Sequence, residues 1–435
     1  MQPGAPPPGT RGRLLPSAAV QGRRRLLPGG FRQALSLLRR NGDFARLYSA
    51  QLISFGGDWF ATVALVGLVF DLTGSAAFTA LALSIQLLGF AAFTPLGGYL
   101  ADRVNRRWLM VGSDTARAVL ILGLLLVDRP DEVWIALGIV GAVSALGALF
   151  EPTSSASVPN LVDREDLPVA NALVGSAWGM MLAVGGALGG LVAATLGRNA
   201  AFVGDALSFA LSAGLLVGIR RPFAEPRGDG EHAGMLSALA ETFRYARRDH
   251  RVLALLSVKG GFGLGAGVIG LLPVFALEVF RAGDRGTGIL FAFRGIGALI
   301  GPFLARRFTR DLAGVLLGCS LAMVTYGIFY GLFPLSGSLL VAGILTMLAH
   351  LGGGGQWTLS TYGLQTVVPD FIRGRVFSFD YGLVTLTLAL SIFISGWAAD
   401  HLGPRAVMYG LAAVSILYAL VWTILTRRIR RSAAG

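Results

Sequence analysis

The sequence has almost none of the residues on which disulfide-stabilised proteins and metalloenzymes depend. One cysteine, Cys319, and four histidines occur in 435 residues. A single cysteine cannot form an intrachain disulfide or supply several thiolates to a zinc site. No metal-ligand spacing, nucleophile elbow or pair of catalytic acids is present. We therefore expect no metal, no cofactor and no enzyme chemistry.

Lysine is nearly absent as well. Lys259 is the only lysine, in the stretch LLSVKGG. A Walker loop needs a lysine that follows a glycine-rich loop and precedes Ser or Thr. The sequence therefore excludes an ATP-driven process within this chain.

Charge of either sign is scarce, at 14% of the chain against about 25% in soluble proteins, while 54% of the residues are hydrophobic. Apolar runs of about eighteen residues or more, long enough to cross a bilayer, recur along nearly the whole chain. We count twelve; ten or eleven stay open because the runs near 199 and 286 are short or interrupted. The sequence predicts an all-α membrane protein with transmembrane helices at 46–70, 76–101, 108–128, 133–152, 171–195, 199–219, 252–278, 286–305, 312–333, 337–360, 378–399 and 405–426.

The net charge of +13 is placed unevenly. With the amino terminus inside, 29 of the 37 basic residues lie in the tails and the loops on that side, five lie in the opposite loops and three within spans. This asymmetry follows the positive-inside rule. It predicts a multi-pass protein of the inner (cytoplasmic) membrane with both termini in the cytoplasm. Because topology accounts for the basicity, we expect no nucleic-acid partner.

The chain divides into two parts of similar length. Residues 1–43 are rich in Pro, Gly and Arg and lack the apolar core of a signal peptide, so we expect a disordered basic arm, or in part a misassigned start. Residues 220–250 read as a cytoplasmic linker with an amphipathic helix. The linker separates six spans in 44–219 from six in 251–427, and a tail follows at 428–435.

The two parts also resemble each other. GLVAATLGRNAAFVG (190–204) and GWAADHLGPRAVMYG (396–410) match at six of fifteen positions, and VPNLV (158–162) aligns with VPDFI (368–372). Parallel repeats of six spans are typical of transporters whose substrate binds at midplane between two rocking halves. Chance similarity among Gly- and Ala-rich helices is the alternative.

The loop after the second span, GGYLADRVNRR, resembles the signature loop of the major facilitator superfamily. The resemblance implies the major facilitator fold, with two pseudo-symmetric six-helix halves. Asn105 stands where that family usually has Gly, and we expect it to tolerate the positive φ of the turn. The positions that match in register are Gly98, Leu100, Asp102, Arg103, Arg106 and Arg107.

Helix electrostatics also explains why this loop combines an aspartate with arginines, whatever family the chain belongs to. Asp102 is expected at a helix carboxyl end, where the helix dipole disfavours a negative charge, so it needs the neighbouring arginines. The resemblance implies that this aspartate also meets the amino end of span 11, near Arg373 and Arg375, when the protein is open to the outside. The alternative is a positive-inside loop with an incidental acid.

Further segments resemble one branch, that of enterobactin exporters and macrolide-efflux proteins: 54–65, 150–173, 202–213 and 366–376. The stretch GGALGG (185–190) is similar to the antiporter motif of span 5, although Gly186 replaces its proline. Its other glycines, Gly185, Gly189 and Gly190, permit close helix packing.

Ionisable residues inside spans are costly and are functional candidates by default. Asp58 lies about twelve residues into span 1, roughly 18 Å along the helix and close to midplane. Burial disfavours a charged carboxylate, so Asp58 can stay neutral until water or a cation reaches it, as a proton carrier requires. A structural acid bonded to neighbouring helices is the alternative. Arg294 in span 8 is either its counter-charge, a site for an anionic substrate group, or a partner of backbone carbonyls.

The other candidates are more ambiguous. Asp114 and Arg117 face the same side of span 3 and can neutralise each other. Asp205 lies near the outer end of span 6, where it either reaches the interface or joins a proton path. Lys259 either snorkels to the cytoplasmic surface or faces a cavity. Gln356 follows four glycines in HLGGGGQWTLS (350–360), which form a hinge lining the cavity or pack closely against neighbours.

These observations lead to one main hypothesis. We expect a secondary active transporter, a monomer that exports a small amphipathic compound, such as a drug or siderophore, by alternating access as protons move inward. Its partners would be that substrate, protons and membrane lipid, with the proton gradient as energy source. The alternatives are a lipid, lysolipid or facilitated transporter without proton coupling, and a scaffold or sensor that does not transport.

Overall fold

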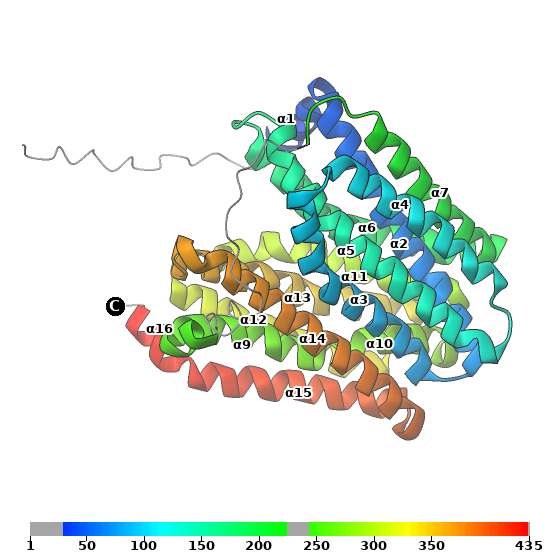
Figure 1. Ribbon diagram of the computed structural model, residues 1–435. Helices are drawn as coiled ribbons and strands as arrows, with labels where there is room; N and C mark the ends of the chain where they lie inside the picture. Colours follow the sequence, from blue (N-terminus) through cyan, green and yellow to red (C-terminus); the bar gives the residue numbers. More distant parts are fainter. Residues whose placement is uncertain (1–28, 224–242, 434–435) are drawn as a thin grey trace, which may run out of the picture.

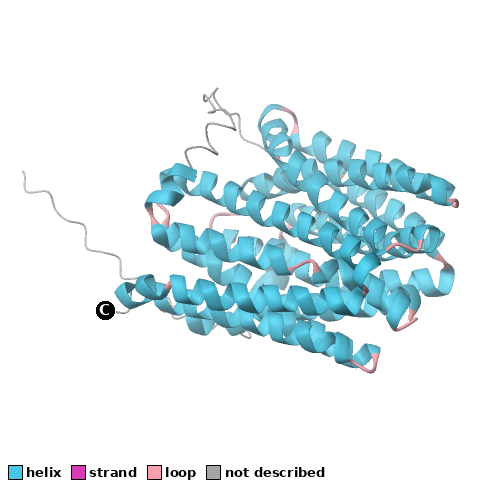
Figure 2. Ribbon diagram, turned by 90° about the horizontal axis from the view of Figure 1, so that it is seen from below, coloured by secondary structure: helices cyan, strands magenta, loops and turns pink. Residues whose placement is uncertain are grey.

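The computed structural model describes residues 29–223 and 243–433, and all regular elements in these ranges are helices (Figure 2). Within them, twelve spans are long and apolar enough to cross a membrane, as predicted. The chain is therefore a multi-pass membrane protein. Its elements are α1 (Gly29–Arg40), α2 (Gly42–Thr73), α3 (Ala76–Arg103), α4 (Arg106–Leu122), η1 (Gly123–Leu126), η2 (Pro130–Glu132), α5 (Val133–Leu161), α6 (Leu167–Leu196), α7 (Arg198–Val217), α9 (His250–Gly265), α10 (Val268–Val274), η3 (Phe275–Val279), α11 (Gly283–Ala305), η4 (Arg306–Phe308), α12 (Leu312–Leu332), η5 (Phe333–Leu335), α13 (Leu339–Val367), α14 (Asp370–Leu402), α15 (Pro404–Leu425) and α16 (Arg427–Ala433).

The helices form two bundles, α2–α7 and α9–α15, which we call the N-half and the C-half (Figure 1). Two helix pairs join them: α3 packs along α14, and α6 packs along α11. The halves are inclined to each other and spread apart toward the end that carries α1 and α16 (Figure 1). We call this the arginine-rich end, and the other, where α2 meets α3, the opposite end.

Pseudo-symmetry between the halves is visible in two tight helix–helix joints. Gly197 joins α6 to α7 with φ 85° and ψ 161°, and Gly403 joins α14 to α15 with φ 80° and ψ 149°. Side chains rarely adopt a positive φ, so both joints favour glycine. These glycines occupy the same place in the repeat predicted from 190–204 and 396–410. The second predicted match is wrong, because 158–162 runs to the end of α5 whereas 368–372 spans the turn into α14.

The amino-terminal arm is more ordered than predicted. The expectation of disorder over 1–43 is wrong for residues 29–43, where α1 packs on the N-half and α2 begins; residues 1–28 lie outside the described ranges. Leu37 is buried, and Arg40 forms an ion pair with Asp166. The amphipathic helix expected within 220–250 falls mainly in 224–242, also outside the described ranges, and residues 243–248 are helical.

The seventh span is broken between α9 and α10, at the glycines of 260–267. Two serines of α14 satisfy the backbone there. Ser391 Oγ accepts from Gly267 N (2.9 Å) and donates to Leu264 O (2.6 Å), and Ser395 Oγ donates to Gly267 O (2.9 Å). Within a membrane, a broken helix persists only where neighbouring groups replace the lost hydrogen bonds. By contrast, the glycine run at 352–355 lies inside the continuous helix α13 and packs closely on α11 and α12.

We expect Ser391→Ala and Ser395→Ala to lower thermal stability more than Ser157→Ala. Each removes the partner of a buried backbone group, which costs about 1–3 kcal/mol. Ser157 is a matched control, because it is buried and donates only within its own helix, to Thr153 O. Thermal unfolding in detergent measures the difference; equal losses in the three variants would contradict the assigned role of these serines.

Candidate functional site

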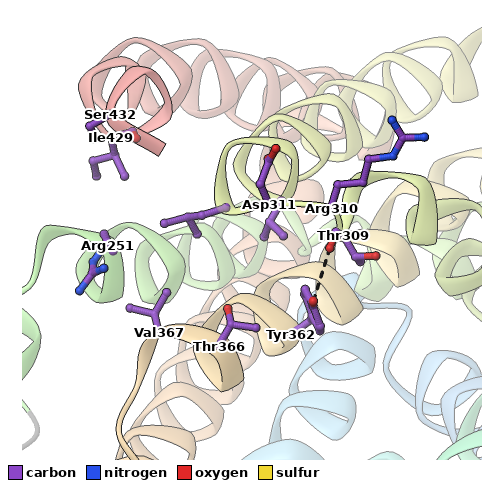
Figure 3. Close-up of a pocket in the computed structure, with 11 residues that line it drawn as sticks. Arg251, Thr309, Arg310, Asp311, Tyr362, Thr366, Val367, Ile429 and Ser432 are labelled. Atoms are coloured by element: carbon purple, nitrogen blue, oxygen red, sulfur yellow. Dashed lines mark hydrogen bonds between the residues drawn. The ribbon is translucent and has the colours of Figure 1, made fainter. Parts of the chain in front are cut away.

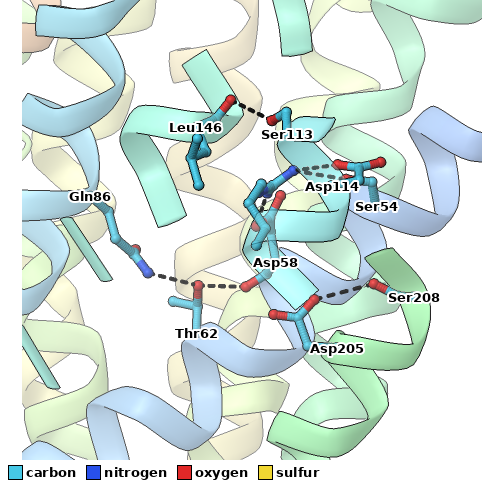
Figure 4. Close-up of polar contacts among 10 residues, drawn as sticks. Ser54, Asp58, Thr62, Gln86, Ser113, Asp114, Leu146, Asp205 and Ser208 are labelled. Carbon is cyan, nitrogen blue, oxygen red and sulfur yellow. Dashed lines mark hydrogen bonds and ion pairs between the residues drawn. The ribbon is translucent and has the colours of Figure 1, made fainter. Parts of the chain in front are cut away.

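A buried polar cluster fills the centre of the N-half (Figure 4). Arg117 of α4 holds it together: Nη2 donates to Asp58 Oδ1 of α2 (2.5 Å), and Nη1 donates to Asp114 Oδ1 (3.1 Å) and to Ser54 Oγ (3.1 Å). The guanidinium also lies 3.9 Å from the centre of the Phe209 ring. Asp114 and Arg117 do neutralise each other, but Arg117 is shared with Asp58.

Asp205 belongs to the same cluster. The expectation that Asp205 reaches the membrane interface is wrong, because this residue is 1% exposed and its Oδ1 accepts from Ser208 Oγ (3.2 Å). Asp205 lies within electrostatic range of Asp58 and Arg117. Gly57 of α2 allows this approach, since a Cβ there would come within 2.3 Å of Asp205 Oδ1.

A cavity of about 460 Å³ lies against the cluster, mainly in the N-half and closed partly by Tyr381 and Thr385 of α14. Most of its lining is apolar or aromatic. Asp58, Asp205 and Glu151 supply carboxyl groups to the wall, and Arg117 supplies the guanidinium. The Asp58 side chain is 35% exposed whereas that of Arg117 is 4% exposed, so Asp58 is where the cluster meets the cavity.

The C-half contains a separate ion pair. Lys259 of α9 contacts the Asp380 carboxylate of α14, donates to Thr361 Oγ1 (3.1 Å) and lies 4.7 Å from the centre of the Trp357 ring. Lysine and aspartate are both buried, so the prediction of a snorkelling Lys259 is wrong. Gln356 Nε2 donates to Val258 O (2.9 Å) and thus ties α13 to α9 beside this pair.

Arg294 is not the counter-charge of Asp58, because Arg117 holds that place. The Arg294 guanidinium lies 5.7 Å from the centre of the Trp59 ring, 5.8 Å from that of Trp178 and 6.0 Å from that of Phe291. The residue is 7% exposed. Arg294 of the C-half therefore stacks on aromatic side chains of the N-half, at the junction of α2, α6 and α11.

Comparison with known proteins identifies this arrangement. The sequence profile of the family described as transmembrane secretion effector, within the major facilitator superfamily, matches residues 33–434. The chain belongs to this family. It is 24% identical to macrolide efflux protein A of Streptococcus pyogenes, over 83% of this chain and 90% of that protein. It is 25% identical to the multidrug efflux pump Tap of Mycolicibacterium fortuitum, over 89% and 97%. Among solved structures, a POT family transporter aligns with a TM-score of 0.73 at 11% identity, over 89% and 96%.

These findings confirm the resemblance to the major facilitator superfamily. The matched family and the relatives named above are transporters and not enzymes. In the family's loop signature, Asp102 lies in the last turn of α3, with its side chain outside the described residues. Asn105 caps α4 with φ −64° and accepts from Arg107 N (3.0 Å). The expectation that this position needs a positive φ is therefore wrong.

The loop arginines hold the arginine-rich end together through backbone carbonyls. Arg106 donates to Ala101 O (2.9 Å) and Ala156 O (2.7 Å), and so ties α3 to α5. The Arg103 guanidinium lies 4.1 Å from the centre of the Tyr99 ring, and that of Arg107 lies 5.3 Å from the centre of the Phe223 ring. Arg373 Nε donates to Val368 O (3.2 Å), and Arg375 is half-buried in the first turns of α14. A Cβ on Gly98 would meet open space.

The glycines of the antiporter-like motif face two different helices. A Cβ on Gly185 or Gly189 would come within 2.6 Å of backbone oxygens of α2, inside the N-half. A Cβ on Gly190 would meet the Asp284 carbonyl at 2.7 Å, across the interface with α11. Gly186, which replaces the proline, faces Phe291 at 3.0 Å. This motif therefore sets both the packing of α6 and its contact with the other half.

Polar contacts join the two halves at the opposite end. Asp400, near the end of α14, accepts from Ala76 N (2.7 Å), Ala77 N (3.1 Å) and Ser75 Oγ (2.6 Å), so it caps the amino end of α3. Beside the other helix pair, Arg198 at the start of α7 donates Nε (2.8 Å) and Nη2 (3.2 Å) to the Asp284 carboxylate of α11. Both contacts favour this conformation, in which the halves meet at the opposite end.

A second hollow of about 460 Å³ lies within the C-half at the arginine-rich end (Figure 3). Arg251, Asp311 and Tyr362 are among its lining residues, and Tyr362 donates to Thr309 O at 3.4 Å. It involves neither the central cluster nor the interface between the halves. We therefore place the candidate transport site in the first cavity.

Sequence reasoning missed several of these residues. Asp380 and Glu151 lie inside predicted spans or at their edges, where any acid is unusual, so their position was a usable signal. Asp400 and Asp284 lie at span ends, where acids are common, and nothing in the sequence singled them out. Their importance depends on which helix of the other half lies opposite.

We expect Asp400→Ala to loosen the contact at the opposite end. It removes three hydrogen bonds to a helix amino terminus, worth about 1–2 kcal/mol, or roughly a five- to thirtyfold shift between conformations. The reporter is Ser84→Cys in a Cys319→Ala background, because Ser84 is buried and donates to Ala389 O across the interface (2.9 Å). The maleimide labelling rate should rise in Asp400→Ala and stay unchanged in Asp131→Ala, an exposed acid at the same end; no rise in Asp400→Ala contradicts the contact's role.

Proposed function

We propose that this protein is a proton-coupled exporter of a small amphipathic compound, working by alternating access. The observation that carries the proposal is the placement of Asp58, which is bonded to the buried Arg117 and yet faces the cavity of the N-half that α14 partly closes. A proton carrier needs both features. It must reach water in one conformation, and it must have a cation that competes with the proton.

The charge balance of the cluster supports the same proposal. Asp58, Asp114, Asp205 and Glu151 are four carboxyl groups in or beside one cavity wall, with Arg117 as the cation. Several buried negative charges against one positive charge are unfavourable in a low-dielectric interior. Proton uptake by one carboxyl group relieves this imbalance and weakens its bond to Arg117. Substrate binding and proton binding can thus exclude each other in the same cavity.

The direction of transport follows from which end faces the cytoplasm. The positive-inside rule places the arginine-rich end there, with both described ends of the chain. The halves spread toward that end (Figure 1), so this conformation would load substrate from the cytoplasm. The names of the relatives, a macrolide efflux protein and a multidrug efflux pump, support export.

Closure at the arginine-rich end would use Asp102. It lies in the last turn of α3, where the helix dipole disfavours its charge, and the amino end of α14 begins at Asp370 on the adjoining helix. When the halves rock together at this end, the carboxylate would gain that amino end as a partner. Arg373 and Arg375, in the first turns of α14, add positive charge to the same place.

The substrate would be amphipathic, because the cavity wall is largely apolar and aromatic with charged groups on one side. Two alternatives predict different behaviour. A lipid, lysolipid or facilitated transporter would move substrate equally well after an uncoupler collapses the proton gradient. A scaffold or sensor would show no flux at all.

We expect Asp58→Asn to abolish pH-gradient-driven transport, because the amide cannot carry a proton. The measurement is erythromycin transport in proteoliposomes with an imposed pH gradient, and we expect at least a tenfold lower initial rate. Asp128→Asn, which changes an exposed loop acid, serves as the control and should transport normally. Unaltered coupled transport in Asp58→Asn would overturn the proton-carrier role.

Topology is tested with single cysteines in a Cys319→Ala background. Asp131→Cys, at the opposite end, should react with a membrane-impermeant maleimide in intact cells. Glu165→Cys, in the loop between α5 and α6 at the arginine-rich end, should react only after permeabilisation. The reverse pattern would place the arginine-rich end outside and would rule out loading from the cytoplasm in this conformation.

A further inference from the structure

Arg294 differs from the other basic side chains inside the bundle. Arg117 and Lys259 are buried, and each contacts a carboxylate. Arg294 is 7% exposed and makes neither an ion pair nor a hydrogen bond with any described residue. Its Nε is completely buried without a partner. A buried charge without a counter-charge is strongly unfavourable, so this guanidinium requires an anion that the described chain does not supply.

The aromatic side chains around Arg294 account for only part of this requirement. Trp59 and Trp178 lie within 6 Å, and a cation over an aromatic ring is attracted by the negative face of the ring. Rings cannot satisfy the N–H donors of a guanidinium as an oxyanion does. The arrangement therefore holds the arginine in place and leaves its donors available.

A second unsatisfied donor belongs to Tyr326. Tyr326 of α12 is 2% exposed, its hydroxyl has no hydrogen-bond partner in the described chain, and it lies within electrostatic range of the guanidinium. The neighbouring Tyr330 hydroxyl is bonded to His350 Nε2 (2.9 Å), and the Tyr326 and Tyr330 rings pack edge to face at 4.8 Å. Packing thus fixes Tyr326 while its hydroxyl stays free to donate.

Two of the aromatic side chains around Arg294 also line the cavity. Trp59 and Trp178 line the cavity wall and meet edge to face at 6.1 Å. Both belong to the N-half, whereas Arg294 and Tyr326 belong to the C-half. A ligand group that reached Arg294 from this side of the cavity would contact both halves at once, as a substrate of a rocking transporter must.

We propose that Arg294 and Tyr326 form a subsite for an anionic group, a carboxylate or sulfonate, on an aromatic compound whose ring system lies against Trp59 and Trp178. The proposal rests on the assignment of the cavity as the transport site and adds aromatic anions to the amphipathic compounds proposed for it. No ion pair joins Arg294 to the described carboxyl groups of the Asp58 cluster, so ligand binding at this subsite is measured without a proton gradient.

Equilibrium binding tests the proposal with a matched pair of probes, 2-naphthoate and its uncharged amide, 2-naphthamide. Isothermal titration calorimetry on the purified full chain should give at least tenfold tighter binding of the naphthoate. Arg294→Gln should remove this preference and leave naphthamide binding unchanged. Tyr326→Phe should weaken naphthoate binding about three- to tenfold. Arg285→Gln, which removes an exposed arginine from the same helix, should behave as wild type.

The proposal is overturned if wild type binds both probes equally, if it binds no naphthoate, or if Arg294→Gln keeps the preference. Thermal unfolding checks each variant. If Arg294→Gln does not fold, Arg294→Lys replaces it and should keep the preference at reduced strength; a preference undiminished in both Arg294→Lys and Tyr326→Phe overturns the proposal. Since no gradient is applied, a failure here leaves the Asp58 prediction standing, and normal coupled transport by Asp58→Asn leaves the subsite standing.

Discussion

The bilayer interior supplies no water, so each polar group that the chain places there must find its partner within the protein. This constraint explains most of the structure. It explains why the described regular elements are all helices, and why two serines of α14 bond the backbone where the seventh span breaks. It also explains why Arg117 is shared among carboxylates and why Lys259 is paired with Asp380. Among the buried basic side chains described within the spans, Arg294 is the one without a counter-charge or a hydrogen bond.

The two halves use their charges differently. In the polar cluster of the N-half, acids outnumber the guanidinium of Arg117, and the partly exposed Asp58 faces the cavity. In the C-half, one lysine and one aspartate balance each other in a buried pair. Removing one partner of such a pair costs about 3–5 kcal/mol, whereas replacing both by apolar residues costs far less. The main role of the Lys259–Asp380 pair is therefore to hold α9 against α14. A change of protonation is therefore easier to accommodate in the cluster of the N-half than in the buried pair of the C-half.

Much of the fold could be predicted from the sequence, because hydrophobic length and charge placement act locally. Partners could not. The pair Asp114 and Arg117 was accessible, since three residues of helix bring them to one face, but Arg117 and Asp58 are 59 positions apart and Lys259 and Asp380 are 121 apart. The same limit applies to glycine. The runs at 260–267 and 352–355 look alike, yet only the first breaks its helix, because Ser391 and Ser395 lie opposite to replace the lost hydrogen bonds.

The helices α3 and α14 run antiparallel, so the carboxyl end of each lies toward the amino end of the other. A single electrostatic rule then applies at both ends of the interface, because a carboxylate is disfavoured at the end of its own helix and favoured at the start of its neighbour. At the opposite end Asp400 satisfies this rule by capping α3. Inclined halves cannot meet at both ends at once. With the alternating access proposed above, a second closed arrangement would form at the arginine-rich end, and a modest free energy from substrate or proton would suffice to shift the balance between the two.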